Sequence, residues 1–158
     1  MTHRVPQAEL SPEVLRTFPL LATASDEVLE NLHQAGMQVE VPAQRLMYVP
    51  GEPCMGFPLV LSGRARVYTV GENGREITLY RLCAGETCVL AVACILSRRM
   101  LPAYIVAETS GAVLLVPPET FRGWFEQVPF WRTFVFSLLA ERLANVIAIT
   151  NDALFGRL

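Results

Sequence analysis

From Met37 onward, apolar residues recur at about every second position, and turn residues interrupt them at short intervals. The alternating positions are Val39 and Val41, Leu46 and Tyr48, Leu59 and Leu61, then Ala65, Val67 and Thr69, then Ile77 and Leu79, and later Ile105, Val113 and Leu115. The interruptions are Pro50-Gly51-Glu52-Pro53, Ser62-Gly63 and Gly71-Glu72-Asn73-Gly74. Short strands at regular spacing are typical of antiparallel rolls and barrels. We therefore expect an α+β fold, mainly β, built on an antiparallel double-stranded β-helix, or jelly roll.

Two short helices are expected before the roll. Ser11 is a good N-cap, Pro12 fits the first helical position, and Glu13 places negative charge at the positive end of the helix dipole. A second helix is expected to begin after Ser25 and to end at Gly36 as a left-handed cap.

A long helix is expected after the roll, opened by Pro129 and preceded by a short helix over residues 119–127. The long segment carries apolar or small residues at alternating four- and three-residue steps: Leu139, Leu143, Val146, Thr150 and Ala153. That spacing is typical of the seam of a two-stranded coiled coil, although a stripe packed on its own domain has the same period. We expect a roll domain over residues 1–127 and a dimerisation helix over residues 128–158.

Composition narrows the classes of function. Hydrophobic residues make up 52% of the 158 residues and charged residues 18%, which favours an oligomer that covers apolar surface. Thirteen basic residues, all arginine, oppose fifteen acidic ones, and no basic run is present to bind nucleic acid through this chain alone. The sequence shows no secretion signal and no uninterrupted apolar span, so we expect a cytoplasmic protein without a membrane partner.

Several short motifs, in this order and spacing, resemble the sensor domain of the Crp/Fnr transcription regulators, which shares the cyclic-nucleotide-binding fold. They are Pro50-Gly51-Glu52, the segment from Leu61 to Tyr68, Leu82-Cys83-Ala84-Gly85-Glu86, Pro102-Ala103-Tyr104 and Glu141-Arg142-Leu143. The resemblance implies a homodimer whose DNA contact is made by a helix-turn-helix domain that follows the long helix. The sequence ends at Phe155-Gly156-Arg157-Leu158, which looks like the hinge before that domain, so we expect an isolated sensor domain.

The resemblance also implies where a cyclic nucleotide would be held. Nucleotide-binding relatives grip the ribose and phosphate with a Phe-Gly-Glu triplet and an Arg-Ser or Arg-Thr pair before Ala. With Gly85, Glu86 and Ala103 as anchors, the triplet falls on Cys88-Val89-Leu90 and the pair on Leu101-Pro102. A buried phosphate without its bidentate cation loses several kcal/mol, so we expect ordinary cAMP or cGMP binding to be absent.

The rest of the implied pocket is also apolar. Positions that relatives use for hydroxyls against the base fall on Val146 and Ile147. Arg98 and Arg99 lie close in sequence to the phosphate position and either compensate for the missing arginine or occupy a solvated loop. The pocket is expected to hold an apolar small-molecule effector or nothing.

Four cysteines raise a second class of function. Cys54, Cys83, Cys88 and Cys94 match no standard metal spacing, and Cys88 and Cys94 lie among apolar residues typical of a core. They are structural thiols, a redox or electrophile sensor, or ligands of zinc or an iron-sulfur cluster. Haem has little support from the two histidines, His3 and His33, and no arrangement of nucleophile and base indicates an enzyme.

Three hypotheses therefore remain: a dimeric Crp/Fnr-type sensor without ordinary nucleotide binding, a cysteine-based redox or metal module, and an interaction domain whose pocket is filled by its own side chains.

Overall fold

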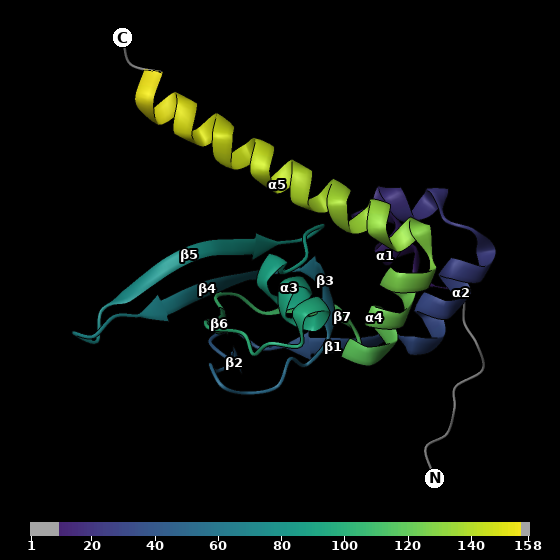
Figure 1. Ribbon diagram of the computed structural model, residues 1–158, viewed down its shortest axis with the longest axis horizontal. Helices are drawn as coiled ribbons and strands as arrows, with labels where there is room; N and C mark the ends of the chain where they lie inside the picture. The colour runs from purple at the N-terminus through teal and green to yellow at the C-terminus, as the bar shows by residue number, and fades with distance from the viewer. Residues whose placement is uncertain (1–9, 156–158) are drawn as a thin grey trace. The chain divides into compact units, whose positions relative to one another are not determined.

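The structure is a computed structural model that describes residues 10–155 (Figure 1). The chain divides into two compact units, one ending at Arg122 and the other beginning at Gly123. The division falls inside a helix, five residues before the boundary that we expect at residue 127.

The first unit begins with the expected helices. Helix α1 (Pro12–Thr17) starts after Ser11, whose hydroxyl accepts from the Glu13 amide at 3.3 Å, and a 3₁₀ turn, η1 (Pro19–Thr23), follows it. Helix α2 (Asp26–Ala35) starts after Ser25, whose hydroxyl accepts from the Val28 amide. These N-caps confirm the sequence prediction.

The expected left-handed cap at Gly36 is wrong. Gly36 has φ −72° and ψ 138°, an extended conformation that leads directly into the first strand. A Cβ at this position would lie 2.7 Å from the carbonyl oxygen of Leu32. Glycine is therefore required here for the close approach of the backbone, and positive φ plays no part.

Seven strands among the described residues form two antiparallel sheets. They are β1 (Met37–Val41), β2 (Leu46–Tyr48), β3 (Phe57–Ser62), β4 (Arg64–Val70), β5 (Glu76–Cys83), β6 (Tyr104–Ala107) and β7 (Gly111–Val116). One sheet has the order β1-β7-β3 and the other β2-β6-β4-β5. This arrangement confirms the predicted antiparallel roll of an α+β fold, but the fold is not mainly β, because more of the described residues lie in helices than in strands.

The turns between strands follow their sequence chemistry. Gly63 joins β3 to β4 with φ +85°, and Gly74 lies in the β4–β5 hairpin with φ +77°. In that hairpin the Gly71 amide donates to the Arg75 carbonyl at 2.8 Å. Figure 1 shows β4 and β5 as a long hairpin extending from the roll.

The interior of the roll is apolar and continuous with the short helix α3 (Val89–Ser97), which follows β5. The buried residues shared by the sheets and α3 include Val60, Val67, Leu82, Cys88, Ala91 and Ala103. Helix α3 therefore seals one side of the roll.

Two further helices follow β7 in the described part of the chain. Helix α4 (Pro118–Gln127) contributes Phe121, whose ring stacks on that of Phe57 at 3.9 Å within the first unit. Helix α5 (Pro129–Phe155) has 27 residues, which corresponds to about 40 Å of helix. The expected hinge at residues 156–158 lies outside the described residues.

Helix α5 is apolar enough to resemble a membrane span. The stretch Pro129–Leu154 passes by length and composition, with only 11% of its apolar window buried. A helix that covers its apolar side against a protein partner has the same composition, so this is weak evidence for a membrane.

Candidate functional site

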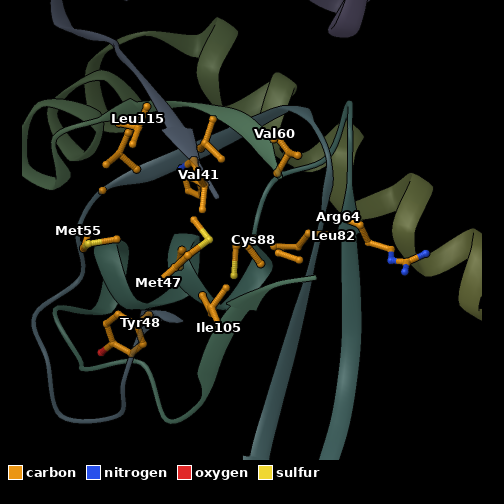
Figure 2. A pocket seen from close by; sticks show the side chains of 18 of the residues that line it. Val41, Met47, Tyr48, Met55, Val60, Arg64, Leu82, Cys88, Ile105 and Leu115 are labelled. Carbon is orange, nitrogen blue, oxygen red and sulfur yellow. The ribbon is translucent and has the colours of Figure 1, made fainter. Parts of the chain in front are cut away.

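A cavity of about 110 Å³ lies inside the roll, between its two sheets (Figure 2). Its walls are almost wholly apolar, and every strand of the roll contributes to them. The residues that line it include Val41, Met47, Tyr48, Cys54, Met55, Val60, Arg64, Leu82, Cys88, Ala91, Leu101, Ile105 and Val113.

Strand alternation brings most of these residues inward, and an irregularity in β2 adds one more. The pairing of β2 with β6 shifts register between Leu46 and Tyr48. Because of this irregularity, Met47 and Tyr48 both line the cavity although they are adjacent in sequence. In Figure 2, Met47 reaches toward the middle of the cavity.

The start of helix α3 forms one wall of the cavity. A tyrosine of β5 accepts a hydrogen bond from one of the backbone amides there that have no partner within the helix. Cys88 is the N-cap residue but makes no side-chain capping bond. Instead, the hydroxyl oxygen of Tyr80 accepts from the Leu90 amide at 3.4 Å and lies 3.1 Å from Cys88 Sγ. A helix N-terminus that commonly receives an anion is thus occupied by a hydroxyl of the protein itself.

Leu101, in the loop after α3, forms another part of the cavity wall. Its side chain is 2% exposed and packs with Tyr48 and Cys94. The Leu101 amide donates to the Tyr48 hydroxyl at 3.0 Å, and that hydroxyl donates to the Glu52 carbonyl oxygen. The Leu101 side chain is therefore packed in the core, and its amide is already hydrogen-bonded within the protein.

The four thiols have different environments, and none is in a disulfide. Cys83 is exposed, Cys54 is half-buried, and Cys88 and Cys94 are buried. Burial raises the pKa of Cys54, Cys88 and Cys94, and a hydrogen bond from Tyr80 opposes part of the rise at Cys88. Among residues 10–155, no group of three or more His, Cys, Asp or Glu side chains is placed to hold a metal ion.

Comparison with known proteins now identifies the family. The family model for the cyclic nucleotide-binding domain matches residues 38–128, more than half of the chain and most of the roll. The chain belongs to the cyclic nucleotide-binding domain family. None of the curated proteins matches this sequence.

Solved structures relate this cyclic nucleotide-binding domain to Crp/Fnr-type sensor domains. A Crp/Fnr-family regulator from Eubacterium rectale is 26% identical, with TM-score 0.72, over 87% of this chain. The N-terminal domain of a transcriptional regulator from Streptomyces coelicolor is 24% identical (TM-score 0.62, 89% of this chain and 96% of that one). The sensor domain of the regulator DNR from Pseudomonas aeruginosa is 18% identical (TM-score 0.66, 86% and 90%).

The match covers only part of the length of the Eubacterium rectale regulator. The chain spans 63% of the length of the Eubacterium rectale regulator. Over this span the fold is similar to that of Crp/Fnr-type regulators, the family that the sequence motifs resemble.

Of the site residues that the resemblance implied in this cyclic nucleotide-binding domain, some line the cavity and others lie outside it. Cys88 and Leu101 line the cavity. Gly85 and Glu86 form the turn after β5, where the Glu86 carboxylate accepts from the Cys83 amide at 2.9 Å.

The remaining predicted residues lie away from the cavity lining. Val89 and Leu90 are half-buried at the start of α3, and Ala103 is buried in the core. Arg98, Arg99 and Pro102 are exposed. Val146 and Ile147 belong to the second unit, with 49% and 52% of their surface exposed.

Sequence reasoning missed the residues that contribute most of the lining. Met47, Met55 and Val113 line the cavity, and none of them is among the site residues that the resemblance implied. Val113 faces inward by strand alternation, whereas Met55 lies in the loop before β3. The register shift that turns Met47 inward leaves no mark in the sequence.

The thiols give a first testable prediction. We expect Cys83 to react first with a bulky thiol reagent, Cys54 more slowly, and Cys88 and Cys94 only on unfolding, because access and thiolate fraction govern the rate. Mass-mapped labelling of the folded domain measures the order. Fast modification of Cys88 and Cys94 together, or their recovery as a disulfide, contradicts the structural role of these two thiols.

Proposed function

We propose that this chain is the effector-sensing and dimerising part of a cytoplasmic Crp/Fnr-type DNA-binding transcription regulator. The family match and the roll with its long C-terminal helix support this role. DNA contact is assigned to a helix-turn-helix domain outside this chain, because the described residues carry no basic surface run and the formal net charge is −2. No membrane partner is proposed.

The effector is proposed to be something other than an ordinary cyclic nucleotide. The observation that carries this proposal is Leu101, which stands where the resemblance implies the arginine that grips the phosphate. The Leu101 side chain is buried and carries no charge, and its backbone N–H already donates a hydrogen bond to the Tyr48 hydroxyl. Leu101 therefore offers a phosphate neither a positive charge nor a hydrogen-bond donor. Leu90 likewise stands at the ribose-binding position and offers no acceptor.

The apolar cavity between the sheets supports a different kind of ligand. Among the residues that line it, Arg64 is the charged one, and its guanidinium is paired with Glu108 at 3.1 Å. An apolar small molecule matches this lining, since it brings no polar group that must remain unpaired.

Calorimetry with cAMP and cGMP tests the nucleotide proposal. We expect no saturable heat with either nucleotide, because the phosphate would be desolvated without a cation. The exposed Arg98 and Arg99 provide the matched control: a double substitution to glutamine is expected to change nothing. Binding at low micromolar affinity, about −8 kcal/mol, that is lost in this variant shows that the loop has taken over the phosphate.

Dimerisation is proposed through helix α5. From Glu141 to Leu154 nearly every residue is exposed, including the large apolar side chains Leu143, Val146, Ile147, Ile149 and Leu154. The seam residues Leu139, Leu143, Val146, Thr150 and Ala153 fall along one side of this helix, and Glu141, Asn145, Ala148 and Asp152 along the other. A parallel pair of helices covers such a seam.

A thiol sensor remains the alternative. The exposed Cys83 is the observation that favours it, since an accessible thiol is the first to meet an oxidant or electrophile. Zinc or an iron-sulfur cluster requires more thiolates brought together than any group within residues 10–155 provides.

A further inference from the structure

The cavity inside the roll has a size that suits one small molecule. Its volume is about 110 Å³. An apolar cavity of about 150 Å³ stays dry and binds benzene, so a space of this order suits a single six-membered ring. Two fused rings are too large for the cavity as its walls stand.

The polar atoms in the wall are already used by the protein. The lining residues with a side-chain nitrogen or oxygen are Tyr48, Ser62, Arg64 and Thr109. The Tyr48 hydroxyl donates to one backbone carbonyl and accepts from one backbone amide. The hydroxyls of Ser62 and Thr109 accept from backbone amides at 3.0 and 2.9 Å. Among residues 10–155, no buried side-chain nitrogen or oxygen lacks a hydrogen-bond partner, so no side chain in the wall requires a polar group from a ligand.

The wall also offers no charge to an ionic ligand. Arg64 is already paired with Glu108 at 3.1 Å. Burial raises the pKa of Cys54 and of Cys88, so both thiols stay protonated near neutral pH. An ion that enters this space loses its hydration without gaining a partner. A ligand that fits the cavity is therefore uncharged.

The thioethers in the wall favour an aromatic ring over an aliphatic one. Met47 and Met55 both line the cavity. In Figure 2, the Met47 side chain reaches toward the middle of the cavity. Met55 is 51% exposed, so it lies where the cavity meets solvent. A methionine sulfur makes favourable contacts with an aromatic ring, and its flexible side chain adapts to the ring that enters.

We propose, on the basis of the function proposed above for this cavity, that its ligand is one uncharged aromatic hydrocarbon of about the size of benzene or toluene. Met47 sets the size limit. The register shift of β2 against β6 directs Met47 inward beside Tyr48, so its side chain occupies space that a strictly alternating strand leaves open. A smaller side chain at this position admits a larger ring.

The ligand class and the proposed function fail separately. Saturable binding of cAMP in calorimetry contradicts the proposed function, whether or not benzene binds. Absence of benzene binding in a domain that is dimeric and does not bind cAMP contradicts only the ligand class.

The test is a titration with benzene of the folded chain, labelled with ¹³C at its methionine methyl groups and observed by NMR. We expect saturable shifts of the Met47 and Met55 methyl signals, because the ring current of a bound aromatic ring acts on the methyl groups beside it. The dissociation constant is expected to be about 1 mM or lower, within the affinity per atom that small ligands reach. Met37 and Met100 are each 62% exposed and lie outside the lining, so their signals are expected not to shift.

Two further probes test polarity and size. Phenol carries one hydroxyl that the cavity leaves unpaired, so it is expected to bind at least about tenfold more weakly than benzene. Naphthalene, with two fused rings, is expected not to bind the unaltered chain and to bind Met47→Ala, whose shorter side chain enlarges the cavity.

A conservative variant tests the role of the sulfur. Met47→Leu removes the sulfur and conserves side-chain volume, so the experiment stays decisive if Met47→Ala fails to fold. With the Met55 methyl group as reporter, Met47→Leu is expected to lower the ratio of benzene affinity to cyclohexane affinity about threefold. The matched control is Met100→Leu, which removes an exposed thioether and is expected to leave this ratio unchanged. Circular dichroism and a thermal melt establish that each variant is folded.

Four results overturn the proposal. They are the absence of saturable shifts with benzene, shifts of Met37 and Met100 as large as those of Met47, binding of naphthalene to the unaltered chain as tight as that of benzene, and a change of the affinity ratio in Met100→Leu equal to that in Met47→Leu.

Discussion

Replacing Leu143 and Val146 with glutamate is expected to convert the domain from a dimer to a monomer. Both residues lie on the proposed seam of α5 and are 61% and 49% exposed in the single chain. In a two-fold dimer the double substitution places four carboxylates in one apolar seam, where desolvation and like-charge repulsion each oppose association. A cost of more than about 4 kcal/mol corresponds to at least a thousandfold weaker dimer.

A matched control separates seam position from added charge. Ala144 and Ala148 are also exposed on α5 but lie on the face away from the seam. Their double replacement with glutamate adds the same charge and is expected to leave the dimer intact. Analytical ultracentrifugation measures all three proteins, and a parent domain already monomeric at about ten micromolar or above contradicts the seam.

Replacing Arg122 with methionine is expected to lower the free energy of unfolding by about 2–3 kcal/mol. Arg122 is 7% exposed and donates from Nε to the Ile95 carbonyl oxygen at 2.9 Å, with a second donation from its terminal nitrogen to the same oxygen. Ile95 lies near the C-terminal end of α3, where the carbonyl oxygens receive no hydrogen bond from within the helix. Methionine fills the space but leaves this carbonyl without its charged partner.

Urea denaturation at a fixed protein concentration measures the loss, since the stability of a dimer depends on concentration. The control is Glu119→Gln. Glu119 is bonded to Arg122 but its side chain is 75% exposed, so solvent screens the pair and a much smaller change is expected. If both variants lose the same free energy of unfolding, the hydrogen bond from Arg122 to the Ile95 carbonyl is not the main contribution of Arg122 to stability.

The Arg122 contact also joins the start of α4 to the helix that forms part of the cavity wall. Helix α3 contributes Cys88 and Ala91 to the cavity wall, and its other end is held by Arg122 on α4.

Local chemistry in the sequence determined much of this protein. The N-caps at Ser11 and Ser25, the glycine turns at Gly63 and Gly74, and the period-two pattern after Met37 act over a few residues, so they predicted the helices and the roll correctly. The ordered motifs around Gly85-Glu86 predicted the family. Runs of apolar neighbours around Cys88 and Cys94 predicted their burial.

Only the tertiary structure decided what the interior of the roll contains. Gly36 is extended because the chain must pass the Leu32 carbonyl to reach β1, and Met47 faces inward because β2 shifts register against β6. The Tyr48 hydroxyl accepts from the amide of Leu101, 53 residues further along the chain. The Tyr80 hydroxyl accepts from the amide of Leu90, 10 residues further along. Such long-range pairings depend on how two sheets meet, and residue spacing alone carries no record of that geometry.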